Sequence, residues 1–141
     1  MKHSLKKLLA LHYKLILCFL ILLQTLTLIF TFTTKREGFH SDENWSYGYA
    51  NSFFQSNIYI DNNKKSINTD KWEDSSILRD YIEVQNGERF RFDSVFDNMS
   101  EDFSPPLHSL ILHGICSFFP ESFSWWYGFS INIVAYILSI W

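Results

Sequence analysis

Two adjacent carboxylates in this sequence stand where they could accept a proton. Asp42 and Glu43 lie among aromatic residues, a few positions after a long apolar run. A carboxylate beside lipid and aromatic rings loses part of its hydration, which raises its pKa and makes it a better proton acceptor near neutral pH. Alternatively, Asp42 caps a helix and Glu43 faces water at the positive end of the helix dipole.

A third carboxylate, Asp102, lies sixty residues after Asp42 and precedes the stretch SPPLH. We expect Asp42 and Asp102 to converge on one surface cleft. There they could deprotonate an acceptor hydroxyl, bind a divalent cation such as Mg²⁺ or Mn²⁺, or both. Taken alone, a carboxylate in the place of Asp102 is typical of a helix start.

Other kinds of site find less support in the sequence. His108 and His113 are five residues apart, which is the wrong spacing for one helix face, so a zinc site is not expected. No glycine-rich phosphate loop, Ser-His-Asp signature or CxxC motif occurs. Acidic residues outnumber basic ones in residues 35–104, so nucleic acid is not an expected partner. Cys18 and Cys116 are expected to be buried small residues rather than reactive thiols.

The elements that position these carboxylates are expected to be membrane helices. Residues 15–34 carry no charge, and at about 1.5 Å per residue they cover the roughly 30 Å hydrocarbon layer. We therefore expect a transmembrane helix over residues 8–34, after a basic cytoplasmic tail over residues 1–7. A cleaved signal peptide is the alternative, but the run exceeds a usual signal core and no small-residue cleavage site follows it.

The remaining chain divides into three zones. Residues 35–104 hold fourteen of the fifteen acidic residues and eight of the twelve basic ones, a net charge of −6, and are expected outside the cytoplasm. Residues 105–120 begin with two prolines and predict an amphipathic helix at the membrane interface, too short to span. Residues 121–141 begin with an aromatic belt and predict the start of a second transmembrane helix, which the sequence cuts short.

Within the acidic loop, the sequence predicts short juxtamembrane elements. In SDENWSYGYAN, Ser41 or Asp42 would cap a helix that lies along the membrane face, with Trp45, Tyr49 and Phe53 about one turn apart.

Further along the loop, SNIYI, YIEVQ and RFRFDSV alternate with the period of small strands. RFRFDSVFDNMSED could equally be a helix with its apolar residues on one face, and we expect a helix over residues 92–100. The polar stretch 61–76 is expected to be an exposed excursion. The expected fold class is an all-α membrane protein with one transmembrane helix, an external loop of short helices and the start of a second transmembrane helix.

Four stretches, taken in order, resemble the opening of the multi-pass GT-C glycosyltransferases. This lipid-phosphate-sugar-dependent class includes the dolichyl-phosphate-mannose protein mannosyltransferases and related bacterial enzymes. The stretches are the basic start with its apolar helix, SDENWSYGYAN, EDFSPPLHSLILHGICSFFP and SFSWWYGFSINIVAYI. The resemblance covers nearly all of this chain but only the beginning of such an enzyme, whose members have many more helices.

The resemblance implies an activity and roles for particular residues. The reaction would transfer a sugar from a polyprenyl-phosphate donor in the membrane lipid to an acceptor hydroxyl on the outer face of the cell membrane, with inversion at the sugar carbon. Asp42, with Glu43 beside it, would be the catalytic base or would help to bind a divalent cation. Asp102 would lie in the same cavity, as a substrate-binding residue and second metal ligand. His108 stands where relatives carry an aromatic or another polar residue and is a further candidate substrate-binding residue.

Two other interpretations remain open. The chain could be a complete two-span membrane protein whose external loop binds a partner or ligand, or a piece of an unrelated transporter or assembly factor. The apolar carboxyl end without a basic flank favours the longer enzyme. By itself the chain is then expected to be catalytically silent, because a cavity built by many helices cannot form from one and a half.

Overall fold

The structure, a computed structural model, describes residues 2–36, 38, 40–59, 67, 70–102 and 105–140, with side chains for those between 12 and 100 and from 105 onward. Within these residues the chain is all-helical and contains no strand. The elements are α1 (Lys2–Lys35), α2 (Ser41–Asn51), α3 (Ser75–Ile82), the 3₁₀ turn η1 (Asn86–Glu88), α4 (Phe92–Asp102), α5 (Leu107–Phe118) and α6 (Trp125–Ile140). The chain forms two compact units, residues 1–38 with 135–141 and residues 39–134.

Helix α1 is long and apolar. Its segment His12–Lys35, 24 residues in length, is long and apolar enough to cross a membrane. A signal sequence at the amino terminus has the same length and composition. Some of its threonine hydroxyls bond within the helix, since those of Thr27 and Thr34 donate to the carbonyls four residues before them. The helix expected over residues 8–34 is present, and it begins earlier, at Lys2.

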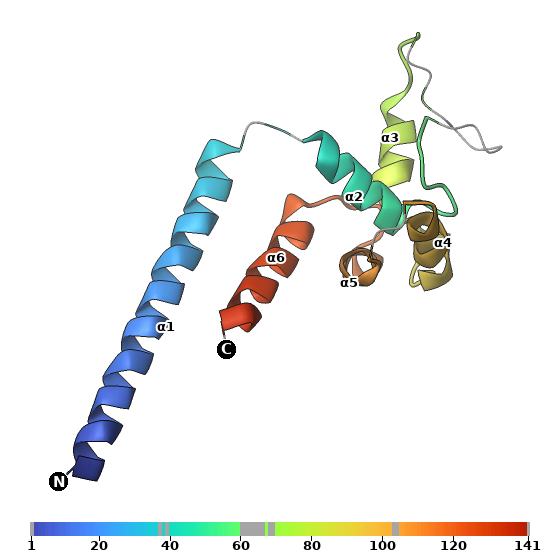
Figure 1. The fold of residues 1–141 in the computed structure, drawn as a ribbon. Coiled ribbons are helices and arrows are strands. Elements are labelled where there is room, and N and C mark those ends of the chain that lie inside the picture. Colours follow the sequence, from blue (N-terminus) through green and yellow to red (C-terminus); the bar gives the residue numbers. More distant parts are fainter. Residues whose placement is uncertain are drawn as a thin grey trace. The chain divides into compact units, whose positions relative to one another are not determined.

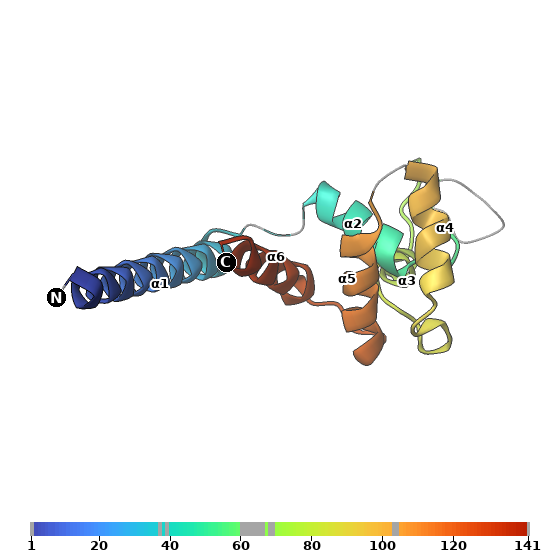
Figure 2. The same ribbon diagram turned by 60° about the horizontal axis from the view of Figure 1, so that its bottom comes forward.

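Helix α2 is the central element of the second unit. It packs against α3, α4 and α5, and α4 in turn packs against α5 (Figures 1 and 2). Two side chains of α4 fasten it to the end of α2: Asn98 Nδ2 and Ser94 Oγ donate to the carbonyl of Ser52 at 2.8 and 2.9 Å. Both donors are buried, so the bonds stabilise the contact and also satisfy groups that water cannot reach.

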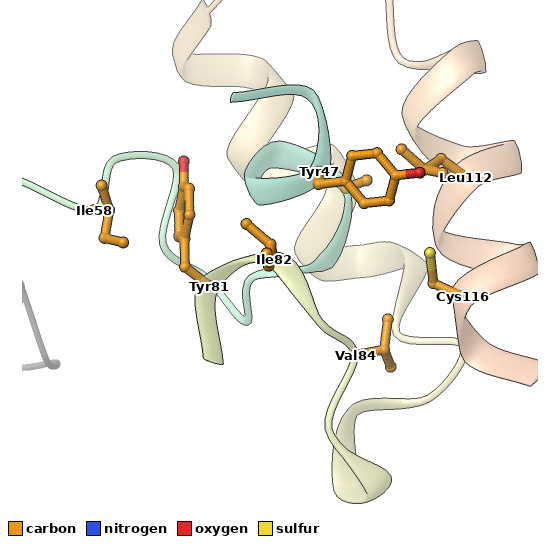
Figure 3. Packing of buried hydrophobic residues seen from close by; sticks show 8 residues of the cluster. Tyr47, Ile58, Tyr81, Ile82, Val84, Leu112 and Cys116 are labelled. Carbon is orange, nitrogen blue, oxygen red and sulfur yellow. The ribbon is translucent and has the colours of Figure 1, made fainter. Parts of the chain in front are cut away.

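The core of this unit collects apolar side chains from α2, α3, α5 and the segments between them (Figure 3). Burial of one such side chain contributes roughly 1.5–3 kcal/mol to folding. The residues are Tyr47, Ala50, Ile58, Tyr81, Ile82, Val84, Leu112 and Cys116. Gly48 lets α2 approach this core closely, because a Cβ at this position would overlap the ring of Tyr81.

The sequence predicted most helices correctly and the small strands wrongly. Helices are present at SDENWSYGYAN, at residues 92–100, after the two prolines and after Pro120. In YIEVQ, Tyr81 and Ile82 end helix α3 instead of starting a strand. In SNIYI, Ile58 and Tyr59 form a turn. Five apolar and polar residues in alternation are too few to distinguish a strand from a helix end whose apolar residues all reach one core.

Two expected features are revised or fall outside the described residues. Helix α2 ends at Asn51, so Phe53 lies beyond it and does not continue the row of Trp45 and Tyr49. Half of the polar stretch 61–76 lies outside the described residues. Its last two residues begin α3, where the carboxylate of Asp74 accepts the N–H of Ser76 at 2.7 Å.

Candidate functional site

The start of helix α2 holds the two carboxylates singled out in the sequence. The N-cap is His40, not Ser41 or Asp42 as the sequence predicts. The Nδ1 atom of His40 accepts the N–H of Asp42 at 3.4 Å, and the His40 N–H donates to Glu43 Oε2 at 3.2 Å. This is a reciprocal capping box, in which histidine takes the place that Ser or Thr usually holds. Glu43 therefore has a structural role at the helix start.

Asp42 differs from its neighbour in being open to solvent. Its side chain is 86% exposed, and its Oδ2 lies 3.6 Å from His40 Nδ1, an ion pair only when the imidazole is protonated. The desolvation expected for this carboxylate from its aromatic neighbours is therefore absent within the chain. It lies in the first turn of α2, at the positive end of the helix dipole.

The hydroxyl of Tyr47 fixes α2 to the beginning of α6. It donates to the carbonyl of Ser124 at 2.7 Å and accepts the N–H of Gly128 at 3.0 Å. The Tyr47 ring also packs edge-on against Phe123, with 4.9 Å between ring centroids. Because Tyr47 lies only five residues after Asp42, this anchor also limits where the carboxylate can move.

The PPLH segment reaches the same unit through α5. Helix α5 begins at Leu107 and packs against α2, so the two stretches that carry the candidate residues meet as neighbouring helices. His108 is half-buried, and burial lowers the pKa of its imidazole. Helix α4 ends at Asp102, whose side chain lies outside the described residues. The convergence of Asp42 and Asp102 on one cleft therefore stays a prediction.

A divalent cation is poorly matched by the side chains described around Asp42. Glu43 is engaged in the capping box, and Asp42 Oδ2 lies 3.6 Å from Nδ1 of the His40 imidazole. Mg²⁺ and Mn²⁺ favour several oxygen ligands. Among the side chains that the structure describes, no group of three or more His, Cys, Asp or Glu residues gathers as a metal site.

The other two candidate side chains of α5 belong to the interior. His113 is 2% exposed, its ring packs edge-on against Phe92 at 5.4 Å, and burial lowers its pKa. Cys116 is also 2% exposed, and burial raises its pKa to about 11. A protonated thiol and a neutral imidazole in a packed core favour structural roles, which agrees with the expectation for this cysteine.

The structure also contains a pocket that the sequence did not indicate. It is wide open, has a volume of about 290 Å³ and is lined by Ser76, Arg79, Asp80, Glu83, Gln85 and Glu121. Glu83 is buried and pairs with Arg79, with Nε and Oε1 3.3 Å apart. Glu121 comes from the turn after α5, and its N–H donates to the carbonyl of Val84 at 2.9 Å. The pocket therefore depends on a tertiary contact, which no local motif signals.

No family model, curated protein sequence or solved structure matches the chain.

Proposed function

We propose that this chain is the amino-terminal part of a GT-C type membrane glycosyltransferase. The whole enzyme would transfer a sugar from a polyprenyl-phosphate donor to an acceptor hydroxyl on the outer face of the membrane. One observation carries the proposal: helix α2, with Asp42 and Glu43 in its first turn, packs against α5, which begins within the PPLH motif at Leu107. The two most specific stretches of the family resemblance, SDENWSYGYAN and EDFSPPLHSLILHGICSFFP, therefore meet in one compact unit, although 49 residues separate them.

A membrane location is part of this proposal. Helix α1 would cross the bilayer from a cytoplasmic amino terminus, and α6 would begin a second crossing. Only five residues separate α1 from α2, and they span at most about 20 Å. The unit formed by residues 39–134 would therefore stay close to the outer membrane surface, where a lipid-linked donor presents its phosphate.

The surface of this unit supports contact with lipid. An outer apolar face combines exposed side chains of α4, of α5 and of the turn before α4. Its members are Phe90, Phe92, Phe96, Leu107, Ile111 and Phe118. Phe90 joins the two helices, since its ring lies 5.2 Å from that of Phe118 and 6.4 Å from that of Phe92. Exposed apolar side chains gathered on neighbouring elements are typical of a binding surface, and an interfacial helix presents such side chains to lipid.

In the proposed reaction Asp42 acts as the general base. Its carboxylate is open to solvent and can reach an acceptor hydroxyl without moving α2. It would take the hydroxyl proton as the oxygen forms a bond to the anomeric carbon and the polyprenyl phosphate leaves. Glu43 and Tyr47 would be positioning residues, because the first caps α2 and the second anchors it to α6.

The test is sugar transfer by membranes that contain the protein expressed from its complete reading frame. The donors would be radiolabelled polyprenyl-phosphate mannose and polyprenyl-phosphate glucose. Asp42→Asn should abolish transfer without changing the amount of protein in the membrane. Asp97→Asn, which changes another exposed carboxylate on α4, should leave transfer intact. Normal turnover in the Asp42→Asn protein would remove Asp42 from the mechanism.

The open pocket favours a second candidate function, a membrane protein whose external loop binds a ligand. Its mixture of one guanidinium, three carboxylates, an amide and a hydroxyl suits a small polar molecule. Under this alternative, Arg79→Ala should abolish ligand binding and Asp42→Asn should not affect it. If Asp42→Asn abolishes sugar transfer and Arg79→Ala does not, the glycosyltransferase is the correct candidate.

A further inference from the structure

Helix α2 has two faces of different character. The face towards the core carries Tyr47, Gly48, Ala50 and Asn51, all buried. The opposite face carries Asp42, Trp45 and Tyr49, whose spacings of three and four residues align them along one side of a helix. A carboxylate and two aromatic rings therefore share the side of α2 that points away from the core.

These rings belong to a cluster that we name the aromatic platform: Trp45, Tyr49 and Tyr59. The ring centroids of Trp45 and Tyr49 are 6.0 Å apart with 30° between their planes, and Tyr59 lies 6.0 Å from Trp45 at 58°. Trp45 and Tyr49 are half-buried, whereas Tyr59 is 54% exposed. The platform is thus supported from within and still offers ring surface to a ligand.

Tyrosine hydroxyls add a polar component to the platform. Tyr81, in the core, donates to the carbonyl of Ser56 at 2.9 Å. Its pKa is raised by burial and further by the neighbouring phenols of Tyr49 and Tyr59. The platform itself carries two further phenol hydroxyls, those of Tyr49 and Tyr59. The Asp42 carboxylate and the rings of Trp45 and Tyr49 lie within little more than two turns of helix α2. Tyr59 joins them from the loop turn that contains Ile58.

This combination matches the surface of a sugar ring. One face of a pyranose consists mainly of C–H groups, which pack against aromatic rings, while its rim carries hydroxyls that bond to carboxylates and phenols. Ligand sites commonly combine aromatic walls with a few well-placed polar groups. We propose that the aromatic platform binds a sugar ring of the substrate next to Asp42. This inference rests on the proposed function and names the part of the site that holds the sugar.

The main competitor is insertion of the same rings into the bilayer interface, where Trp and Tyr are common. The charge distribution argues against it. Asp42 is 86% exposed on the platform side, and placing a carboxylate in lipid is costly. The outer apolar face is the better lipid surface, because α5 contributes Leu107, Ile111 and Phe118 to it and carries no acidic or basic side chain apart from histidine.

The experiment observes individual tryptophans in the ¹⁵N-labelled chain of 141 residues, held in lipid nanodiscs. Each of the five tryptophans gives one indole N–H signal in a proton–nitrogen correlation spectrum. Trp45→Phe identifies the platform signal, and Trp72→Phe identifies a control signal from a fully exposed side chain. The probes are methyl α-D-mannopyranoside and methyl β-D-glucopyranoside, with sorbitol as a polyol that lacks a ring.

We expect at least one glycoside to shift the Trp45 signal saturably, while the Trp72 signal stays constant and sorbitol has no effect. Tyr59→Ala should weaken this binding on the order of tenfold, the equivalent of one lost aromatic contact. A Trp45 signal that no glycoside shifts would overturn the proposal. If no glycoside shifts the Trp45 signal and a nitroxide-labelled lipid broadens it, the platform contacts the bilayer instead of a sugar.

The two proposals can fail separately. If Asp42-dependent sugar transfer is found but no glycoside shifts Trp45, the platform is wrong and the glycosyltransferase stands. If a glycoside shifts Trp45 but the complete protein transfers no sugar, the platform is a sugar-binding site and the proposed reaction is wrong.

Discussion

The Tyr47 hydroxyl accepts a hydrogen bond from the backbone N–H of Gly128 at 3.0 Å, across 81 residues of sequence. The same hydroxyl donates to the carbonyl of Ser124, so it bridges two backbone groups four residues apart in the first turn of α6. Helix α6 begins at Trp125, so both backbone groups lie at its start. A side chain of α2 thus holds the start of α6 and couples the helix that carries Asp42 to the helix that follows the aromatic belt.

We predict that Tyr47→Phe destabilises the protein by about 1–3 kcal/mol, because both backbone groups lose a partly buried partner while the ring is retained. The free energy of unfolding in detergent, from denaturant titration, measures the effect. Tyr59→Phe removes a hydroxyl from a side chain that is 54% exposed and should have little effect. Equal stabilities of the two variants would mean that the bridge contributes nothing.

Gly48 gives a second prediction, on the packing of α2. Replacing glycine by alanine within a helix normally stabilises it, by roughly 0.5–1 kcal/mol. Here the new methyl group would overlap the ring of Tyr81, which is 3% exposed and held by its bond to Ser56. We therefore expect Gly48→Ala to destabilise by about 1–3 kcal/mol. The matched control is Gly87→Ala, where a Cβ meets no atom within 4 Å; similar unfolding midpoints for both variants would contradict the packing argument.

Local sequence signals were sufficient for most of the fold. Pro105 and Pro106 predicted the start of α5, and the apolar spacing of residues 92–100 predicted α4, because both signals act over a single turn. The cap of α2 was missed because His40 is an unusual cap residue, although Glu43 at the third helical position was a recognisable half of a capping box.

The candidate site was predictable only in part. The sequence singles out Asp42 because a carboxylate shortly after an apolar run is conspicuous, and its role stays a prediction. Its exposure could not be predicted, since this depends on which face of α2 meets the core. The pocket around Glu83 and Glu121 was missed because it forms only when the turn after α5 bonds to Val84, and that contact links residues far apart in the chain.

His113 provides a prediction about pH. Burial lowers its pKa in the folded protein, so the unfolded chain, with a pKa near the ordinary 6.5, binds the proton more tightly. Its contribution to stability is therefore fully present above about pH 6.5 and is lost as the pH falls below that value. His113→Gln should flatten the dependence of the unfolding free energy between about pH 7 and pH 5. An unchanged slope would mean that His113 does not contribute to acid sensitivity.

The outer apolar face gives a prediction that separates lipid contact from solvent exposure. Phe118 is 68% exposed within the chain, and Asp97 on the neighbouring helix is exposed as well. Phe118→Cys and Asp97→Cys, each made in a Cys18→Ser, Cys116→Ala background, allow a nitroxide to be attached at either position.

The measurement compares two relaxation agents in nanodiscs: oxygen, which concentrates in lipid, and a nickel chelate, which stays in water. Oxygen should relax the label at 118 more strongly than the chelate does, because a phenylalanine face turned to the bilayer excludes the chelate. The label at 97 should behave in the opposite way, since a carboxylate position stays in water. If the nickel chelate reaches both labels equally, the face does not contact lipid, and the membrane-surface orientation proposed for this unit is wrong.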